Sequence, residues 1–265
     1  MSLFNLKKSA PTENSAGKAR RSYLVCSTPR SGSNLLCEAL KNTKLAGRPH
    51  QYFWVPKMEK WGEKYGLSPE NDFSGYVRGI VEKSATSNGI FGLKSMWDFL
   101  LAFEQRLRAT PEFAAFPGAL HELLAAIFPD LRYVHITRGD KVLQAVSLVR
   151  AIQSDLWTSQ QQEAKPPKEE LRFDPDAIRA MLRDLKEAEA GWESLFTAAG
   201  VQPHRVTYED LASQYEETAI GVLTYLDIPL PAKVPFGERK LQKQGDGLNE
   251  EWAASFRALQ PTQAD

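Results

Sequence analysis

The chain has 265 residues, 42% of them hydrophobic, so it is long enough to bury one sizeable core, and we expect one α/β domain with added helices. Its 33 basic and 33 acidic residues cancel, which leaves no global field to attract nucleic acid or an anionic membrane. We therefore expect no nucleic-acid partner, and any anion site must be local.

Targeting signals are weak throughout the sequence. No apolar run reaches the length of a signal peptide or a membrane span, so we expect no membrane span. The cysteines, Cys26 and Cys37, are predicted to be buried thiols in a reducing compartment, which favours a cytoplasmic location. Residues 9–21 are polar, and we expect residues 1–20 to form a disordered N-terminal arm ahead of a single domain at 21–265.

Residues 23–40 predict a strand, a tight loop and a helix in direct succession. Tyr23 to Cys26 form a short apolar run, and Leu35 to Leu40 show helical spacing. The small residues between them let backbone N–H groups point inward beside the positive end of the helix. With the guanidinium of Arg30 and the hydroxyls of Ser31 and Ser33, this loop is predicted to bind a phosphate or sulfate group.

Two other interpretations of this loop remain open. A nucleotide-triphosphatase loop places a lysine directly after its last glycine, whereas here Gly32 is followed by Ser33 and Asn34. A P-loop kinase that uses ATP is therefore an alternative function, although this loop lacks the lysine that such a kinase needs. The plain alternative is a serine-rich turn that caps an ordinary helix.

Further strands and helices alternate along the rest of the chain. This order predicts a central parallel sheet wrapped by helices. The predicted strands are 89–96, 131–137 and 204–208, and the predicted helices lie around Tyr76 and over 99–108, 112–128, 140–162, 174–198, 209–226 and a C-terminal stretch containing Trp252.

Residues 50–54 combine three aromatic rings with His50 and Gln51. Rings beside polar side chains suit sugar binding, although the edge of a hydrophobic core gives the same pattern. Lys94 lies at the carboxyl end of the predicted strand at 89–96 and Trp97 follows it, and ligands in open α/β sheets bind at such carboxyl ends. A surface lysine with a buried stem is the alternative for Lys94.

The sequence PRSGS at 29–33, followed by LAGRPHQYF at 45–53, resembles the trehalose 2-sulfotransferase family. Its members share a P-loop-like sulfotransferase fold and use PAPS (3′-phosphoadenosine 5′-phosphosulfate) as the sulfuryl donor. The resemblance runs from about Tyr23 to Trp252.

The resemblance implies specific donor contacts. Arg30, Ser31, Gly32, Ser33 and Asn34 would surround the 5′-phosphosulfate. In sulfotransferases, an arginine at a strand end and a serine nine residues later bind the 3′-phosphate, and the pair at this spacing is Arg138 and Ser147. Basic residues of a late loop often contribute as well, and the candidates are Arg239, Lys240 and Lys243.

The resemblance also implies an acceptor site and a catalytic base. The segment around Gln51 and Phe53 corresponds to the family's acceptor loop, with Lys94 and Trp97 nearby. The trehalose-contacting positions differ at Pro29 and Arg48. Gln51 stands where we expect the family's general-base glutamate, and an amide cannot accept a proton at neutral pH. We therefore expect His50 to act as the base if its ring faces the same way.

The helix at 140–162 carries three more candidates, Arg150, Gln153 and Trp157. They lie near one face of this helix, so they predict either acceptor contacts or packing. Histidine and cysteine spacing predicts no metal site.

From these features we predict a PAPS-dependent sulfotransferase that acts on a hydroxyl of a carbohydrate or similar small polyol, with Arg30, Gln51 and His50 as catalytic residues. The alternative is a catalytically impaired PAPS- or PAP-binding protein, because Gln51 replaces the expected glutamate. The sequence leaves a homodimer possible.

Overall fold

A computed structural model describes residues 19–157, 170–239, 241 and 247–259. Its centre is a sheet of parallel strands in the order β2-β1-β3-β4. Residues 1–18 of the predicted N-terminal arm lie outside the described residues. The strands are β1 (Arg21–Ser27), β2 (Ile90–Met96), β3 (Leu131–Thr137) and β4 (His204–Thr207).

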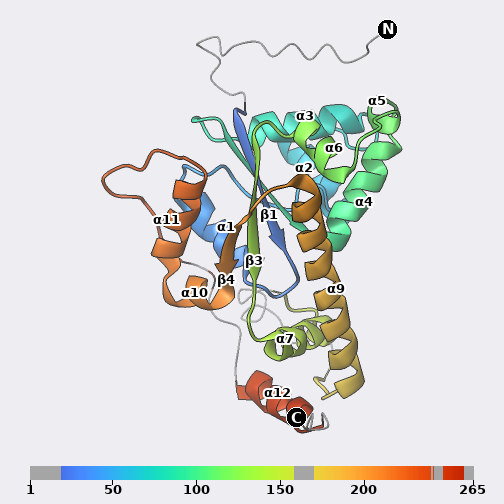
Figure 1. The fold of residues 1–265 in the computed structure, drawn as a ribbon, viewed down its shortest axis with the longest axis vertical. Helices are drawn as coiled ribbons and strands as arrows, with labels where there is room; N and C mark the ends of the chain where they lie inside the picture. Colours follow the sequence, from blue (N-terminus) through green and yellow to red (C-terminus); the bar gives the residue numbers. More distant parts are fainter. Residues whose placement is uncertain (1–18, 158–169, 240, 242–246, 260–265) are drawn as a thin grey trace.

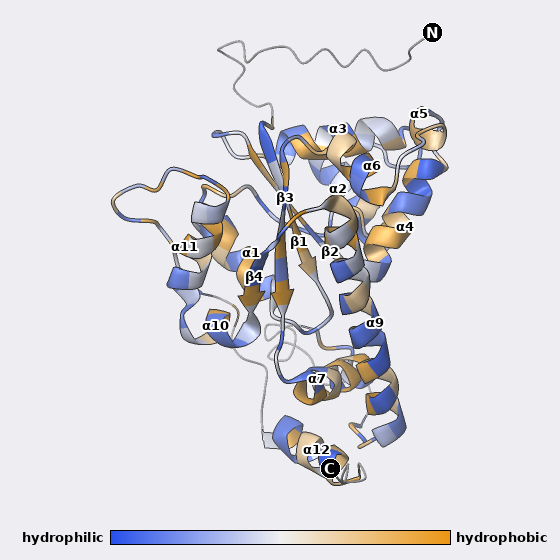
Figure 2. Cartoon of the chain, in the orientation of Figure 1, coloured by the Kyte–Doolittle hydropathy of each residue, from blue (hydrophilic) through white to orange (hydrophobic). Residues whose placement is uncertain are grey.

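Strand β1 is buried along almost its whole length because helices cover both faces of the sheet. Leu24 and Cys26 belong to the hydrophobic cluster on one face, whereas Tyr23 and Val25 belong to the cluster on the other. This alternation follows from the two-residue period of a strand. Figure 2 shows the hydrophobic colour concentrated on the strands and the hydrophilic colour along α9 (Pro175–Ala199).

The face of the sheet that carries Leu24 and Cys26 is covered mostly by helices from the middle of the chain, together with α9 from farther along (Figure 1). Asp174 caps α9 by accepting hydrogen bonds from the N–H groups of Asp176 and Ala177, and Gly200 ends it at φ +64°. The other helices of this layer are α2 (Val55–Tyr65), α3 (Phe73–Ser84), α4 (Trp97–Arg108), α5 (Pro111–Ala114) and α6 (Leu120–Ile127).

The opposite face is covered by α1 (Ser33–Asn42), α10 (Tyr208–Ser213) and α11 (Tyr215–Tyr225). The carboxyl ends of the strands point toward α7 (Lys141–Ser154), and α12 (Gly247–Ala258) packs beyond it (Figure 1). Arg257 of α12 forms an ion pair with Asp140, the N-cap of α7, at 2.7 Å. The parallel sheet therefore brings its strand ends, the start of α1 and α7 together.

The predicted parallel sheet and its helical cover are confirmed, but several helix boundaries differ. The helix predicted over 140–162 ends at Ser154, because Asp155 adopts φ +56° and the Ser154 hydroxyl accepts a hydrogen bond from the Leu156 N–H. The helical stretch predicted over 112–128 is divided into α5 and α6 at Pro117, and this break is expected because proline cannot donate a helical hydrogen bond. The helix predicted over 209–226 is divided at Gln214, whose backbone is not helical.

Helix α2 was not predicted. Its ends carry Pro56 in the first turn and Gly66 in the left-handed conformation at the C-cap, which is the usual asymmetry of helix termini. No helix in the described part of the chain is long and apolar enough to cross a bilayer.

The close packing of α4 on α9 generates a stability prediction. A Cβ atom added at Gly191 would overlap the indole of Trp97, so Gly191→Ala should destabilise the protein by about 1–3 kcal/mol through overpacking. Gly221→Ala is the matched control, because its Cβ would meet only His204 at 3.7 Å, and it should stabilise α11 by about 0.5–1 kcal/mol. Urea unfolding measures both, and equal effects of the two variants would contradict this account of the α4–α9 contact.

Candidate active site

The loop between β1 and α1 has the backbone geometry of an anion cradle. Arg30 adopts φ +64° and Gly32 adopts φ +86°, both in the left-handed region. A Cβ atom at Gly32 would lie 2.7 Å from Cδ2 of Tyr208, so glycine alone fits between the loop and the corner that joins β4 to α10. Helix α1 starts at Ser33, and its first N–H groups have no partners within the helix.

Side chains from α7 and α9 hold this loop in place. The Gln144 amide donates to the Thr28 hydroxyl at 2.9 Å and to the Pro29 carbonyl at 2.7 Å, and Gln144 is completely buried. The Trp192 indole donates to the Ser27 carbonyl at 3.1 Å. The buried Ser31 hydroxyl has no hydrogen-bond partner among the described residues, so it is an available donor.

Three arginines converge beside the loop. The Nε of Arg30 donates to the Ser147 hydroxyl at 2.9 Å, and the guanidinium of Arg138 lies 4.7 Å from the centre of the Tyr208 ring. Burial, together with the charges of Arg138 and Arg150 and against the opposing effect of Tyr208, lowers the pKa of Arg30 to about 10. Three guanidinium groups gathered in one place favour a multiply charged anion.

The structure therefore brings together the predicted donor-binding residues. Ser31 to Asn34 form the end of the loop and the start of α1, while Arg138 and Ser147 come from the end of β3 and from α7. Arg30 reaches Ser147, so its guanidinium lies beside the residues assigned to the 3′-phosphate as well as in the phosphosulfate loop. A ligand with two anionic groups fits this donor set, because the hydroxyl of Ser31 and the arginines offer more donors than one phosphate requires.

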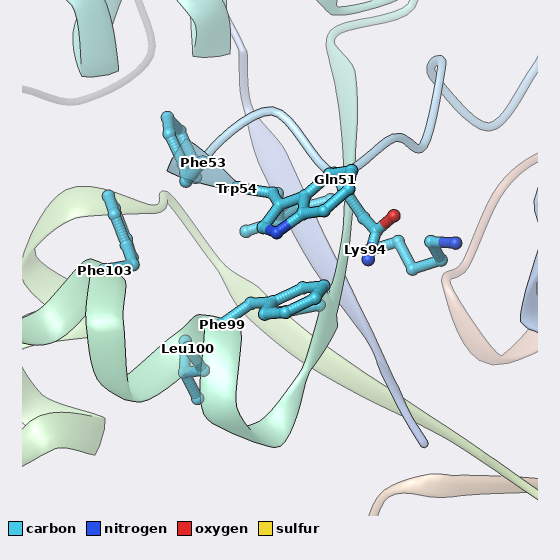
Figure 3. Close-up of a pocket in the computed structure, with 9 residues that line it drawn as sticks. Gln51, Phe53, Trp54, Lys94, Phe99, Leu100 and Phe103 are labelled. Carbon is cyan, nitrogen blue, oxygen red and sulfur yellow. The ribbon is translucent and has the colours of Figure 1, made fainter. Parts of the chain in front are cut away.

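A pocket next to α1 contains the predicted acceptor residues Gln51, Phe53 and Lys94 (Figure 3). About 230 Å³ of space, part of it open to solvent, lies between its lining residues. The rings of Trp54 and Phe99 stack at 5.2 Å and an angle of 17° along one wall. The remaining lining residues are Leu93, Ser95, Leu100 and Phe103.

Backbone pairing places Gln51 beside Lys94. His50 pairs with Leu93 of β2 in a parallel bridge, and the Lys94 N–H donates to the His50 carbonyl at 3.0 Å. The Lys94 side chain is 5% exposed, and its ammonium donates to Oδ1 of Asn34 at 2.5 Å. Burial lowers the pKa of Lys94. Lys94 is thus a buried cation that connects the pocket to the first turn of α1, and its interpretation as a surface lysine is wrong.

Four other predicted residues lie outside the lining of this pocket. The His50 ring packs 4.9 Å from the Trp61 ring, and Trp97 packs 5.1 Å from Trp192 in the core. The Pro29 carbonyl accepts from Gln144 as described above, and Arg48 is exposed. His50 and Gln51 therefore do not face the same space.

Arg239 and the predicted acceptor residues of the 140–162 segment have structural contacts. Arg239 lies 5.1 Å from the centre of the Tyr215 ring, and Lys240 and Lys243 lie outside the described residues. Gln153 exchanges hydrogen bonds with the backbone of Arg172. Arg150 donates to Asn249 of α12 at 2.5 Å, and the carbonyl of Trp157, beyond the end of α7, accepts from Arg30 at 2.8 Å.

Sequence reasoning missed Gln144 and Tyr208, which shape the loop from the other side of the sheet ends. The available signal for Gln144 was a polar residue one turn before Ser147 on a largely buried helix. In the described ranges, no group of three or more histidine, cysteine, aspartate or glutamate side chains is arranged to hold a metal ion.

Comparison with known proteins identifies the family of the chain. The sequence pattern of the Stf0 sulphotransferase family matches residues 22–259. The trehalose 2-sulfotransferase of Mycolicibacterium smegmatis is 29% identical over 89% of this chain and 94% of that protein, and the Mycobacterium tuberculosis enzyme is 28% identical over 92% and 97%. A sulfotransferase domain from the curacin biosynthetic pathway is 15% identical, with a TM-score of 0.45 over 93% of this chain and 94% of that domain. The chain therefore belongs to the Stf0 sulphotransferase family and is a sulfotransferase.

Proposed function

We propose that this sulfotransferase moves a sulfuryl group from PAPS to a hydroxyl of a carbohydrate, trehalose-like, or of a similar small polyol. The observation that carries the proposal is the adjacency of two sites. Lys94 lines the aromatic pocket and binds Asn34 in the first turn of α1, so an acceptor in the pocket would lie next to the anion cradle.

The donor contacts that we propose follow from the available hydrogen-bond donors. Ser31, Ser33, Asn34 and the first N–H groups of α1 would hold the 5′-phosphosulfate, with Gly32 allowing the close approach. Arg138 and Ser147 would hold the 3′-phosphate. The contact between Arg30 and Ser147 supports a role for Arg30 at both ends of the nucleotide.

The chemistry needs positioning and charge stabilisation more than proton transfer. PAPS supplies a sulfuryl group on a phosphate that leaves readily. Arg30, Lys94 and the α1 N-terminus would neutralise the charge on the sulfuryl and phosphate oxygens, while the aromatic wall orients the acceptor hydroxyl in line. The analogous phosphoryl transfers depend on the same two effects.

Proton removal from the acceptor hydroxyl is the smaller term, worth about 10²–10⁴-fold. Gln51 cannot supply it, and the alternative of an impaired binding protein rests on this residue alone. The ring of His50 packs on Trp61 and its pKa is lowered to about 4 by burial and by neighbouring lysines, so it would be a weak base. The kinase alternative is excluded because the chain belongs to a sulfotransferase family.

Nucleotide affinity tests the donor assignment. Arg138→Ala and Ser147→Ala should weaken PAP by at least about tenfold, because each loses a charge-assisted hydrogen bond worth roughly 1.5–3 kcal/mol. Adenosine 5′-phosphosulfate lacks the 3′-phosphate, so its affinity should change little, whereas Arg30→Ala should weaken both ligands. Calorimetry measures these affinities, with Arg179→Ala on the exposed start of α9 as the control. Equal losses for both ligands in Arg138→Ala would remove the 3′-phosphate role.

Restoring a carboxylate tests the acceptor assignment. Gln51→Glu should raise the turnover rate about tenfold or more, since it adds a proton acceptor of nearly the same shape without touching the phosphate loop. Gln51→Met keeps the length of the side chain but has no carboxylate, so it should not raise the rate. Single-turnover transfer from labelled PAPS measures the change. A slower Gln51→Glu enzyme with unchanged PAP affinity would contradict this position for the base.

The protonation of His50 tests the environment beside the pocket. A lowered histidine pKa means that the unfolded chain binds the proton more readily, so the stabilising contribution of His50 is complete above pH 6.5 and is lost as pH falls toward 4. NMR titration should show a neutral His50 imidazole at pH 5.5. A midpoint near 6.5 would show that the ring is hydrated and that it remains available as a base at neutral pH.

A further inference from the structure

Helix α2 separates its charges into two faces. Lys57, Trp61 and Lys64 are spaced by four and three residues, so they share one face of the helix, and Glu59 and Glu63 lie on the opposite side. The Trp61 ring lies 4.9 Å from the His50 ring, and the Lys64 ammonium lies 5.0 Å from the centre of the Trp61 ring. The basic, aromatic face of α2 is therefore the one next to the acceptor segment.

Lys57 lies beside the wall of the pocket. Its ammonium is 4.9 Å from the centre of the Trp54 ring, and Trp54 stacks on Phe99 inside the lining. Lys57 is exposed, so its charge is free to meet a ligand that enters the pocket. The rim of the aromatic wall is thus positively charged.

The charge inside the pocket is positive as well. The lining residues include Lys94 and no aspartate or glutamate. The Lys94 ammonium donates a hydrogen bond to the neutral Asn34 amide, and no carboxylate of the described residues lies within ion-pair distance of it. Burial is the main cause that lowers the pKa of Lys94, and the charge of Lys57 lowers it further.

The lowered pKa of the His50 imidazole has the same excess of positive charge as one of its causes. After burial, the groups that lower its pKa are Lys41, Lys94, Lys64 and Lys57. Like charges held together around a partly closed pocket destabilise one another, and a bound anion relieves that repulsion. The proposed donor would not neutralise all of these lysines, because its proposed contacts come from the α1 loop, β3 and α7, and none comes from α2.

We propose that the acceptor is an anionic carbohydrate, which carries a phosphate, sulfate or carboxylate group that Lys57 binds at the rim of the pocket while the hydroxyl to be sulfated faces Lys94. This inference rests on the proposed function and narrows its acceptor class. A neutral disaccharide gains nothing from the basic face of α2, whereas an oxyanion forms charge-assisted hydrogen bonds there.

Matched acceptors test the proposal. Calorimetry on the PAP-bound enzyme compares trehalose with trehalose 6-phosphate, and glucose with glucose 6-phosphate and glucuronate; transfer from labelled PAPS to the same compounds follows. Each charged compound should bind at least about tenfold more tightly than its neutral counterpart. This difference in affinity should shrink in 0.5 M salt, because the rim is exposed to solvent. Separate phosphate and carboxylate compounds identify which oxyanion is preferred.

Charge reversal on α2 supplies the second measurement. Lys57→Glu should remove the advantage of the charged acceptors and change the affinity of the neutral ones less than about twofold. Lys186→Glu makes the same change at an exposed position of α9 and should alter neither.

Three results would overturn the inference. Neutral acceptors could bind as well as charged ones, the charged acceptors could fail to bind, or Lys57→Glu could weaken both classes equally. The proposed function is judged separately, by the affinity for PAP and by transfer to any hydroxyl. Sulfation of neutral acceptors alone would keep the proposed function and reject the anionic acceptor.

Discussion

The site depends on the left-handed turn between β1 and α1. Arg30 is not a glycine, and a side chain in this conformation costs about 1–2 kcal/mol, so the surrounding contacts must hold it there. Ser147, the Trp157 carbonyl and the Gln144 amide provide those contacts. The turn directs Arg30 toward α7 and starts α1 at Ser33, which in turn places Asn34 against Lys94. The proposed anion cradle and the proposed acceptor pocket are therefore joined at this turn.

The charge arrangement explains how such a loop works without the lysine of a nucleotide-triphosphatase. A compact ammonium after the last glycine would bind one phosphate as a point charge, whereas the forked guanidinium of Arg30 makes several directed hydrogen bonds. Because Arg30 contacts both α7 and the segment at Trp157, it links the loop to elements that also carry Ser147. In the proposed function, the same side chain would contact both anionic groups of the donor nucleotide.

Local patterns predicted much of this molecule. The strand periodicity of residues 23–26 and 131–137, the small-residue loop and the caps Asp174 and Gly200 correspond to physical preferences of short segments, and they correspond to observed elements. The family resemblance and the parallel sheet are confirmed. What the sequence could not predict depends on contacts between distant segments: the burial of Lys94, the position of the His50 ring on Trp61, and the clamp that Gln144 forms on Pro29. Helix α2 was missed because its aromatic start was interpreted only as a binding segment.

One turn of α9 touches both halves of the site. Trp192 donates to Ser27, directly before the phosphate loop, while Gly191 and Trp192 pack on Trp97 at the start of α4, the helix that carries Phe99 of the pocket wall. The spacing between the donor cradle and the acceptor wall is therefore set inside the rigid core and not by a hinge. Because this spacing is fixed, we expect a change in acceptor preference to require new side chains on the wall of the pocket, while the backbone distance between the two halves of the site stays constant.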